Sequence, residues 1–109
     1  MSEYQFYSLM NDTKWEEIRD AVNNSTDKIH WRTKDIMNGY ISQWDGDWYY
    51  HFRDGRHRAI ERLEIKVETD DLKKKVLAIL QEIHVPGKVF KDSIRIYGYA
   101  KTSEAVDYL

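Results

Sequence analysis

One short segment, residues 61–68, constrains the fold most, because its apolar and charged residues alternate without a break. Leu63, Ile65 and Val67 share one side of the pattern, and Arg62, Glu64, Lys66 and Glu68 share the other. Successive side chains of a β-strand point to opposite faces of the sheet. The pattern therefore predicts a strand whose apolar side packs on a core and whose charged side lies in water.

A first helix is predicted before this strand, beginning at Asp12 or Thr13. Thr13 and Glu16 have the spacing of a capping box, in which each side chain bonds the other's backbone N–H. Trp15, Ile18 and Val22 follow at the spacing of one helical face. The turn-forming segment 23–27 ends the helix.

A second helix is predicted directly after the strand, with Thr69 as its N-cap. Its apolar stripe is the strongest in the chain and consists of Leu72, Val76, Ile79, Leu80 and Ile83. It stops at His84–Gly87, because Pro86 disfavours helical geometry in the residue before it.

The remaining regular segments indicate a sheet. Strands are predicted at 29–33, 39–44, 48–53, 89–91 and 94–99. Asp45-Gly46 favours a hairpin between the second and third of these, since a type I′ turn needs positive φ at both central residues. Most connections are too short for crossovers, so the sheet should be mainly antiparallel. We expect an α+β two-layer domain over residues 12–109, with two helices on one face of the sheet. Residues 1–11 form a loosely ordered lead-in, and the tail from Thr102 adds a short helical turn.

Composition limits the environment and the partners. The chain has no cysteine, which excludes disulfides and cysteine-ligated zinc and favours a reducing, cytoplasmic location. The N-terminus does not have the pattern of a signal peptide, and no apolar stretch is long enough to span a bilayer, so no membrane partner is expected. A formal net charge of -2 makes nucleic acid an unfavoured partner, because duplex-DNA binders carry a basic excess.

Catalytic signatures are missing from the sequence. It contains no phosphate-binding glycine loop, no HExxH and no GxSxG, so we expect no cofactor, no metal and no enzyme activity. The alternative enzyme hypothesis is a metal-independent ribonuclease, in which His51, Arg53 and a second histidine act as acid and base. The alternative without catalysis is that these histidines are ordinary surface residues, one on the solvent-facing side of a strand and one in a loop.

Aromatic residues are concentrated between Trp31 and Phe52. Strand alternation prevents all of them from pointing inward, so Tyr40, Trp44 and Tyr49 should reach the surface. Aromatic rings beside arginine are the residues that contribute most to protein interfaces, and they also stack on single-stranded bases. The alternative without a ligand is that these rings lie at the boundary of the core with their polar atoms in water. Nearby acidic and basic residues give this region both signs of charge, which suits a complementary partner.

Several segments carry a resemblance to known proteins. They are Thr13-Lys14-Trp15, Trp31-Arg32-Thr33-Lys34, Gly39-Tyr40 with Trp44-Asp45, Trp48-Tyr49-Tyr50-His51-Phe52-Arg53, Val85-Pro86-Gly87 and Ile96-Tyr97-Gly98-Tyr99. From about residue 12 onward, the chain resembles a family of small bacterial proteins of unknown function, with residues 1–11 outside the match. The resemblance implies no catalytic residue. Its small, cysteine-free format is similar to that of immunity proteins encoded beside bacterial toxins.

Our first hypothesis is therefore a cytoplasmic immunity protein that binds and inhibits a cognate protein toxin, with nucleases as one fitting class of toxin. Aspartates would mimic phosphate in a basic active site, rings would supply contact area, and arginines would pair with carboxylates of the toxin. The expected binding residues are Tyr40, Trp44, Asp45, Asp47, Tyr49, His51, Arg53, Asp54 and Arg56. A single-strand nucleic-acid binder using the same rings is the other alternative.

Overall fold

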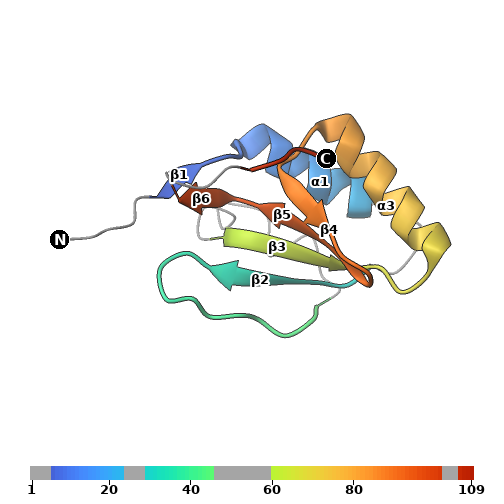
Figure 1. Cartoon of the computed structure of the whole chain (residues 1–109), viewed down its shortest axis with the longest axis horizontal. Coiled ribbons are helices and arrows are strands. Elements are labelled where there is room, and N and C mark those ends of the chain that lie inside the picture. Colours follow the sequence, from blue (N-terminus) through green and yellow to red (C-terminus); the bar gives the residue numbers. More distant parts are fainter. Residues whose placement is uncertain (1–5, 24–28, 46–59, 102–105) are drawn as a thin grey trace.

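The computed structural model describes residues 6–23, 29–45, 60–101 and 106–109. In chain order, its elements are β1 (Phe6–Ser8), α1 (Asp12–Asn23), β2 (Trp31–Asp35), β3 (Ile60–Lys66), α3 (Asp70–Ile83), β4 (Gly87–Val89), β5 (Ser93–Tyr97) and β6 (Tyr99–Lys101). Figure 1 shows the strands side by side beneath the two described helices.

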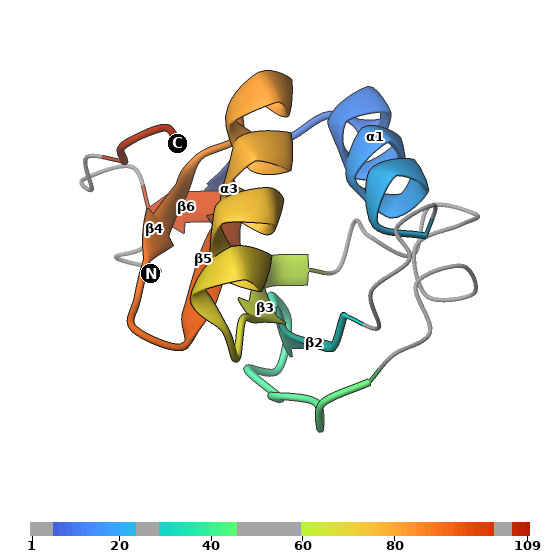
Figure 2. The ribbon, with the colours of Figure 1, turned by 90° about the vertical axis from the view of Figure 1, so that its right-hand side faces the viewer.

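The described strands pair in two antiparallel sheets. The larger sheet has the order β2-β3-β5-β4, and β1 pairs with β6 in a two-stranded sheet. Both described helices lie on the same side of the larger sheet (Figure 2). The predicted α+β fold with a mainly antiparallel sheet is confirmed.

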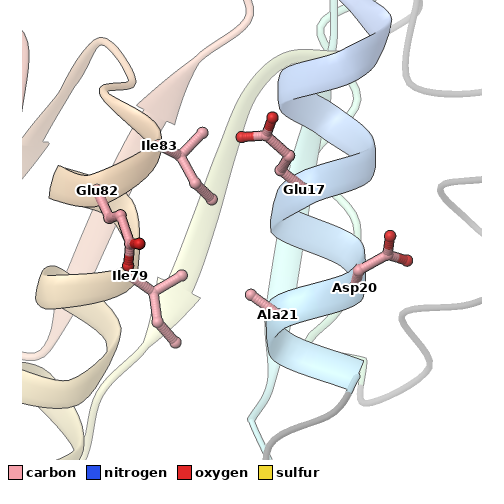
Figure 3. Close-up of a pocket in the computed structure, with 6 residues that line it drawn as sticks. All are labelled: Glu17, Asp20, Ala21, Ile79, Glu82 and Ile83. Atoms are coloured by element: carbon pink, nitrogen blue, oxygen red, sulfur yellow. The ribbon is translucent and has the colours of Figure 1, made fainter.

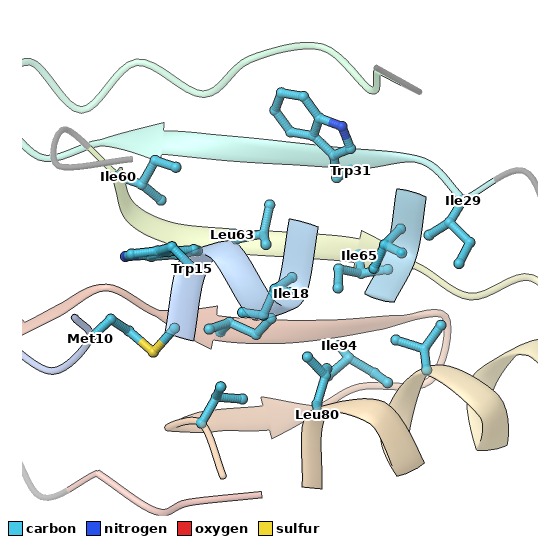
Figure 4. Close-up of a cluster of buried hydrophobic side chains, with 14 of the residues drawn as sticks. Met10, Trp15, Ile18, Ile29, Trp31, Ile60, Leu63, Ile65, Leu80 and Ile94 are labelled. Atoms are coloured by element: carbon cyan, nitrogen blue, oxygen red, sulfur yellow. The ribbon is translucent and has the colours of Figure 1, made fainter. Parts of the chain in front are cut away.

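The alternation that predicted β3 holds on its apolar side. Leu63, Ile65 and Val67 are buried in one cluster with the inward faces of α1 and α3 (Figure 4). On the charged side one expectation is wrong: Glu64 is only 5 % exposed instead of lying in water. Its burial follows from the arginines on either side of it, which are described with the site below.

The start of α1 differs from the predicted capping box. The Asn11 side-chain oxygen accepts the backbone N–H of Lys14 at 2.8 Å, so Asn11 caps the helix in place of Thr13. Trp15, Ile18 and Val22 are buried, as their helical spacing predicts.

The start and end of α3 are where the sequence places them. The Thr69 hydroxyl oxygen accepts the N–H of Leu72 at 3.1 Å. At the other end, His84 adopts a left-handed φ of 65° and its N–H donates to the carbonyl of Leu80. This closes the last helical turn two residues before Pro86.

Three other predictions need correction. Residues 6–8, expected in a loosely ordered lead-in, form β1 opposite β6, and Met10 is buried. Within 39–44 there is no regular strand: the segment runs beside β2 through isolated bridges, and its expected hairpin partner 48–53 lies outside the described residues. At the end of the chain, Tyr108 forms a β-bridge with Pro86, so residues 106–109 are extended instead of helical.

A glycine sets the junction between β5 and β6. The N–H of Gly98 donates to the carbonyl of Glu61 at 2.8 Å, and a Cβ at position 98 would lie 2.2 Å from the carbonyl oxygen of Ile60. It would also lie 3.2 Å from the ring of Trp15. Only glycine allows the two backbones and the Trp15 ring to approach this closely.

Candidate partner-binding surface

The connection after β2, which we call the 35–41 turn, is held by its own hydrogen bonds. The Asp35 carboxylate accepts the N–H groups of Met37 at 2.7 Å and Asn38 at 3.2 Å. The Asp35 carbonyl accepts the N–H of Gly39 at 3.0 Å, and Gly39 has a φ of +73°. Asp35 and Asn38 thus use side-chain oxygens to fix the local backbone, as is typical of short polar residues in turns.

The return path of the turn is fixed in the same way. The Asn38 side-chain oxygen accepts the N–H of Tyr40 at 2.8 Å, and the N–H of Asp35 donates to the Tyr40 carbonyl at 2.9 Å. Beyond the turn, Ser42 donates its N–H to the carbonyl of Thr33 at 2.9 Å. Hydrogen bonds therefore hold the backbone of the turn and connect the segment that follows it to β2.

This ordered turn projects large apolar side chains into solvent. Met37, Tyr40 and Ile41 are 86 %, 65 % and 44 % exposed. Scattered exposed hydrophobic residues are normal, but three within five consecutive residues of a hydrogen-bonded turn are a local concentration. Tyr40 was expected at the surface from the sequence, whereas Met37 and Ile41 were not singled out.

Trp44 and Asp45 lie where the returning segment passes β2. The Trp44 ring is half-buried, with the Arg32 guanidinium carbon 4.6 Å and the Lys66 ammonium 5.6 Å from its centroid. Asp45 is also half-buried, and its backbone exchanges two hydrogen bonds of 2.8 Å with Trp31. Trp44 is thus held against cations of the sheet rather than standing free.

A row of charged residues crosses the face of the sheet opposite the helices. Registered pairing places Arg32 opposite Glu64, Glu64 opposite Arg95, and Arg95 opposite Lys88; we call these four residues the charged row. Arg32 Nε donates to one Glu64 oxygen at 2.8 Å, and Arg95 Nη2 donates to the other at 3.0 Å. One carboxylate on β3 therefore orients two guanidinium groups, one on each of the flanking strands β2 and β5.

The two arginines also determine the ionisation of the row. Burial raises the pKa of Glu64, but hydrogen bonds from Arg95 and Arg32 outweigh it and the pKa is lowered overall. Burial lowers the pKa of Arg95, and hydrogen bonds with Glu64 and Tyr97 reverse that effect. Glu64 and Arg95 therefore each hold the other in its charged form.

Aromatic rings stand at both ends of the charged row. Trp44 lies at the Arg32 end, and Phe90 lies at the other, with Arg95 at 4.7 Å and Lys88 at 5.4 Å from its ring centroid. Cations over ring faces are attracted by the ring quadrupole. The row is thus stabilised at both ends by cation–π contacts.

Most of the residues expected from the sequence to bind a partner lie outside the described part of the chain. They are Asp47, Tyr49, His51, Arg53, Asp54 and Arg56. The ribonuclease hypothesis rests on the same segment and stays a prediction. The described face adds Arg32, Glu64 and Arg95, which sequence reasoning missed; the only local signal was the charged side of residues 61–68.

The described histidines form no catalytic pair. His30 is half-buried beside β2, whereas His84 is exposed at the end of α3 with its ring stacked on Tyr108 at a centroid distance of 4.9 Å. The Lys14 ammonium donates to the His84 carbonyl at 2.6 Å, so the positive charge at the C-terminal end of α3 comes from a lysine on α1. Within the described ranges, no three His, Asp or Glu side chains converge as metal ligands.

A shallow groove separates the two described helices (Figure 3). Its volume is about 470 Å³, and it is lined by Glu17, Asp20, Ala21, Ile79, Glu82 and Ile83. These residues offer carboxylates and aliphatic surface but no nucleophile paired with a base. The groove therefore does not suggest an enzyme active site. No described helix is long and apolar enough to cross a membrane.

Comparison with known proteins gives a family but no activity. A family model described as a family of unknown function, DUF6678, matches residues 1–103. The match includes residues 1–11, which the resemblance seen in the sequence left outside. No curated protein and no solved structure matches the chain significantly.

Proposed function

Because the chain belongs to DUF6678, a family of unknown function, its activity has to be inferred from its own surface, and we propose that it is a protein-binding module. In this proposal it is a cytoplasmic immunity protein of bacterial origin, which binds a cognate toxin and blocks it. The observation that carries the proposal is the 35–41 turn, with its exposed apolar side chains on a hydrogen-bonded backbone.

Rigidity makes this turn suited to binding. Association costs free energy whenever a loop must be ordered, and a loop already fixed by its own hydrogen bonds avoids much of that cost. Bonds from Asp35 and Asn38 hold the backbone of Met37 and Tyr40 before any partner arrives. Tyr40 in particular offers a large ring with few rotatable bonds and a hydroxyl for a hydrogen bond.

The expected partner surface has two parts. A concave apolar pocket would receive Met37 and Tyr40, because aromatic and Met side chains are enriched at the centres of interfaces. Acidic side chains beside the pocket would face Arg32 at the edge of the charged row. In this arrangement the described surface meets an acidic rim of the toxin. The earlier expectation that Asp45, Asp47 and Asp54 mimic phosphate remains a separate prediction.

The test is binding to the product of a toxin gene encoded beside this one, with Tyr40→Ser as the informative variant. Loss of a hot-spot ring costs about 2 kcal/mol or more, so the Kd should rise about 30-fold or more. Tyr7→Ser is the matched control, because Tyr7 is an exposed tyrosine on β1. Protection of cells that express the toxin should weaken in parallel.

Two results would overturn the proposal. One is a neighbouring toxin that fails to bind the wild-type protein and kills cells in its presence. The other is a complex whose Kd changes equally, or not at all, in Tyr40→Ser and Tyr7→Ser.

A further inference from the structure

We propose that the face of the four-stranded sheet opposite α1 and α3 binds single-stranded nucleic acid, an activity separate from protein binding by the 35–41 turn. The inference rests on the cations, the neutralised carboxylates and the aromatic rings that strand register brings together on this face.

Strand register collects basic side chains from four strands onto one face. Arg32 faces Glu64 across β2 and β3, so alternate residues of each strand share this side of the sheet. The basic residues placed there are Arg32, Lys34, Arg62, Lys66, Lys88 and Arg95. This face is therefore locally basic although the chain as a whole has a formal charge of -2.

Three glutamates of the described part of the chain that lie near this face are already paired. Glu64 lies between two arginines, and Glu61 approaches the Lys34 ammonium at 3.2 Å. Glu68 approaches the Lys66 ammonium at 3.4 Å. Phosphate would therefore meet a face on which negative charge is compensated and cations are in excess.

Two cations remain without a carboxylate partner in the described part of the chain. Neither Arg62 nor Lys88 makes an ion pair there, and the Lys88 ammonium lies 5.4 Å from the centroid of the Phe90 ring. The arginines held by Glu64 keep donors as well, because a guanidinium has five N–H groups and each gives one of them to the carboxylate. Glu64 thus acts as a positioning residue that sets the direction of the remaining donors.

Aromatic rings favour nucleic acid over an acidic protein as the ligand. Tyr97 lies opposite Arg62 in register, and Trp44 and Phe90 stand at the two ends of the charged row. Bases stack on aromatic rings and on guanidinium planes, and such stacking tolerates any base. An acidic protein segment, such as polyglutamate, has no planar group that could stack on these rings. The ligand should be single-stranded, because the bases of a duplex are already stacked on one another.

Fluorescence anisotropy of labelled oligo(dT) and oligo(rU) of about 12 nucleotides tests the proposal at several salt concentrations. Wild-type protein should bind both, with log K falling linearly against log salt. Arg62→Ala should weaken binding and reduce the steepness of this slope by about 0.7, the contribution of one phosphate contact in a single strand. Lys74→Ala is the control, because Lys74 is exposed on α3, in the helix layer.

A second pair of variants tests stacking. Tyr97→Leu should weaken binding about fivefold or more, since it removes a ring without changing charge. Tyr40→Ser should leave oligonucleotide binding unchanged, which separates this proposal from the protein-binding one. Circular dichroism confirms that each variant is folded before its affinity is compared.

Three outcomes would overturn the inference. The first is no binding of either oligonucleotide by folded wild-type protein at low salt. The second is an equal effect of Arg62→Ala and Lys74→Ala. The third is competition by polyglutamate as strong as that by unlabelled oligonucleotide, which would assign the face to an acidic protein.

Discussion

Replacement of Glu64 by glutamine tests the central contact of the charged row. Glu64 uses one oxygen for Arg32 and the other for Arg95. Glutamine has the same shape but offers only one oxygen, and its NH₂ group would face one guanidinium donor to donor. The variant therefore loses one charge-assisted hydrogen bond and leaves two positive charges without their shared counter-ion.

The expected loss of stability is moderate. A hydrogen bond to a charged group contributes about 1.5–3 kcal/mol. The side chains of Arg32 and Arg95 are 37 % and 22 % exposed, so water compensates part of the loss. We expect Glu64→Gln to lower the free energy of unfolding by about 2 kcal/mol and the Tm by about 10 °C. Glu68→Gln is the control, because its exposed ion pair with Lys66 should contribute less than about 0.5 kcal/mol.

The pH dependence of this difference gives the sharper measurement. The pKa of Glu64 is lowered on folding, so its ion pairs stabilise the fold above the ordinary carboxyl value of 4.5 and are lost as pH falls through the folded-state pKa. Urea unfolding of wild type and Glu64→Gln should differ by a constant amount near neutral pH, and the two should converge as the pH falls below the ordinary carboxyl value and through the folded-state pKa. A difference that is the same at both ends of this range would refute the ion-pair explanation.

Three further substitutions test the fold by thermal and urea unfolding. Gly98→Ala should lower the free energy of unfolding by about 3 kcal/mol or more, because its Cβ would lie 2.2 Å from the Ile60 carbonyl oxygen. An unchanged free energy of unfolding would contradict this close approach. Thr69→Ala should cost about 1 kcal/mol through loss of the bond to the Leu72 N–H, whereas Thr69→Ser should cost much less. Leu63→Ala should cost about 2–5 kcal/mol, since Leu63 is fully buried, and a smaller effect would place it outside the core.

Elements whose signals are local were predictable from the sequence. The apolar stripe of α3 and its Thr69 cap lie within the helix or next to it, and both are confirmed. The same holds for the apolar side of β3. Strand β1 was missed because three residues are too few to show a period, and its partner β6 lies near the other end of the chain.

Burial of a charged residue was harder to predict, because it depends on strands that are distant in the sequence. The alternation of apolar and charged residues correctly predicted which face of β3 carries Glu64. Taken alone, it also predicted that this side chain lies in water. Its burial comes from Arg32 on β2 and Arg95 on β5, which become its neighbours only through register. Likewise, Tyr40 was expected at the surface from the alternation of a strand that does not form, and its exposure and that of Met37 depend on how the turn is closed.

The segment 40–45 ties the two proposed binding surfaces to one framework. It carries Tyr40 at its start and Trp44 near its end, and its backbone is bonded to β2 at Thr33 and Trp31. Strand β2 is in turn paired with β3 along its length. A protein partner on the turn and an oligonucleotide on the sheet would therefore bind to fixed positions of one scaffold. Coupling between the two ligands would most directly arise where they meet, because Arg32 borders both proposed surfaces.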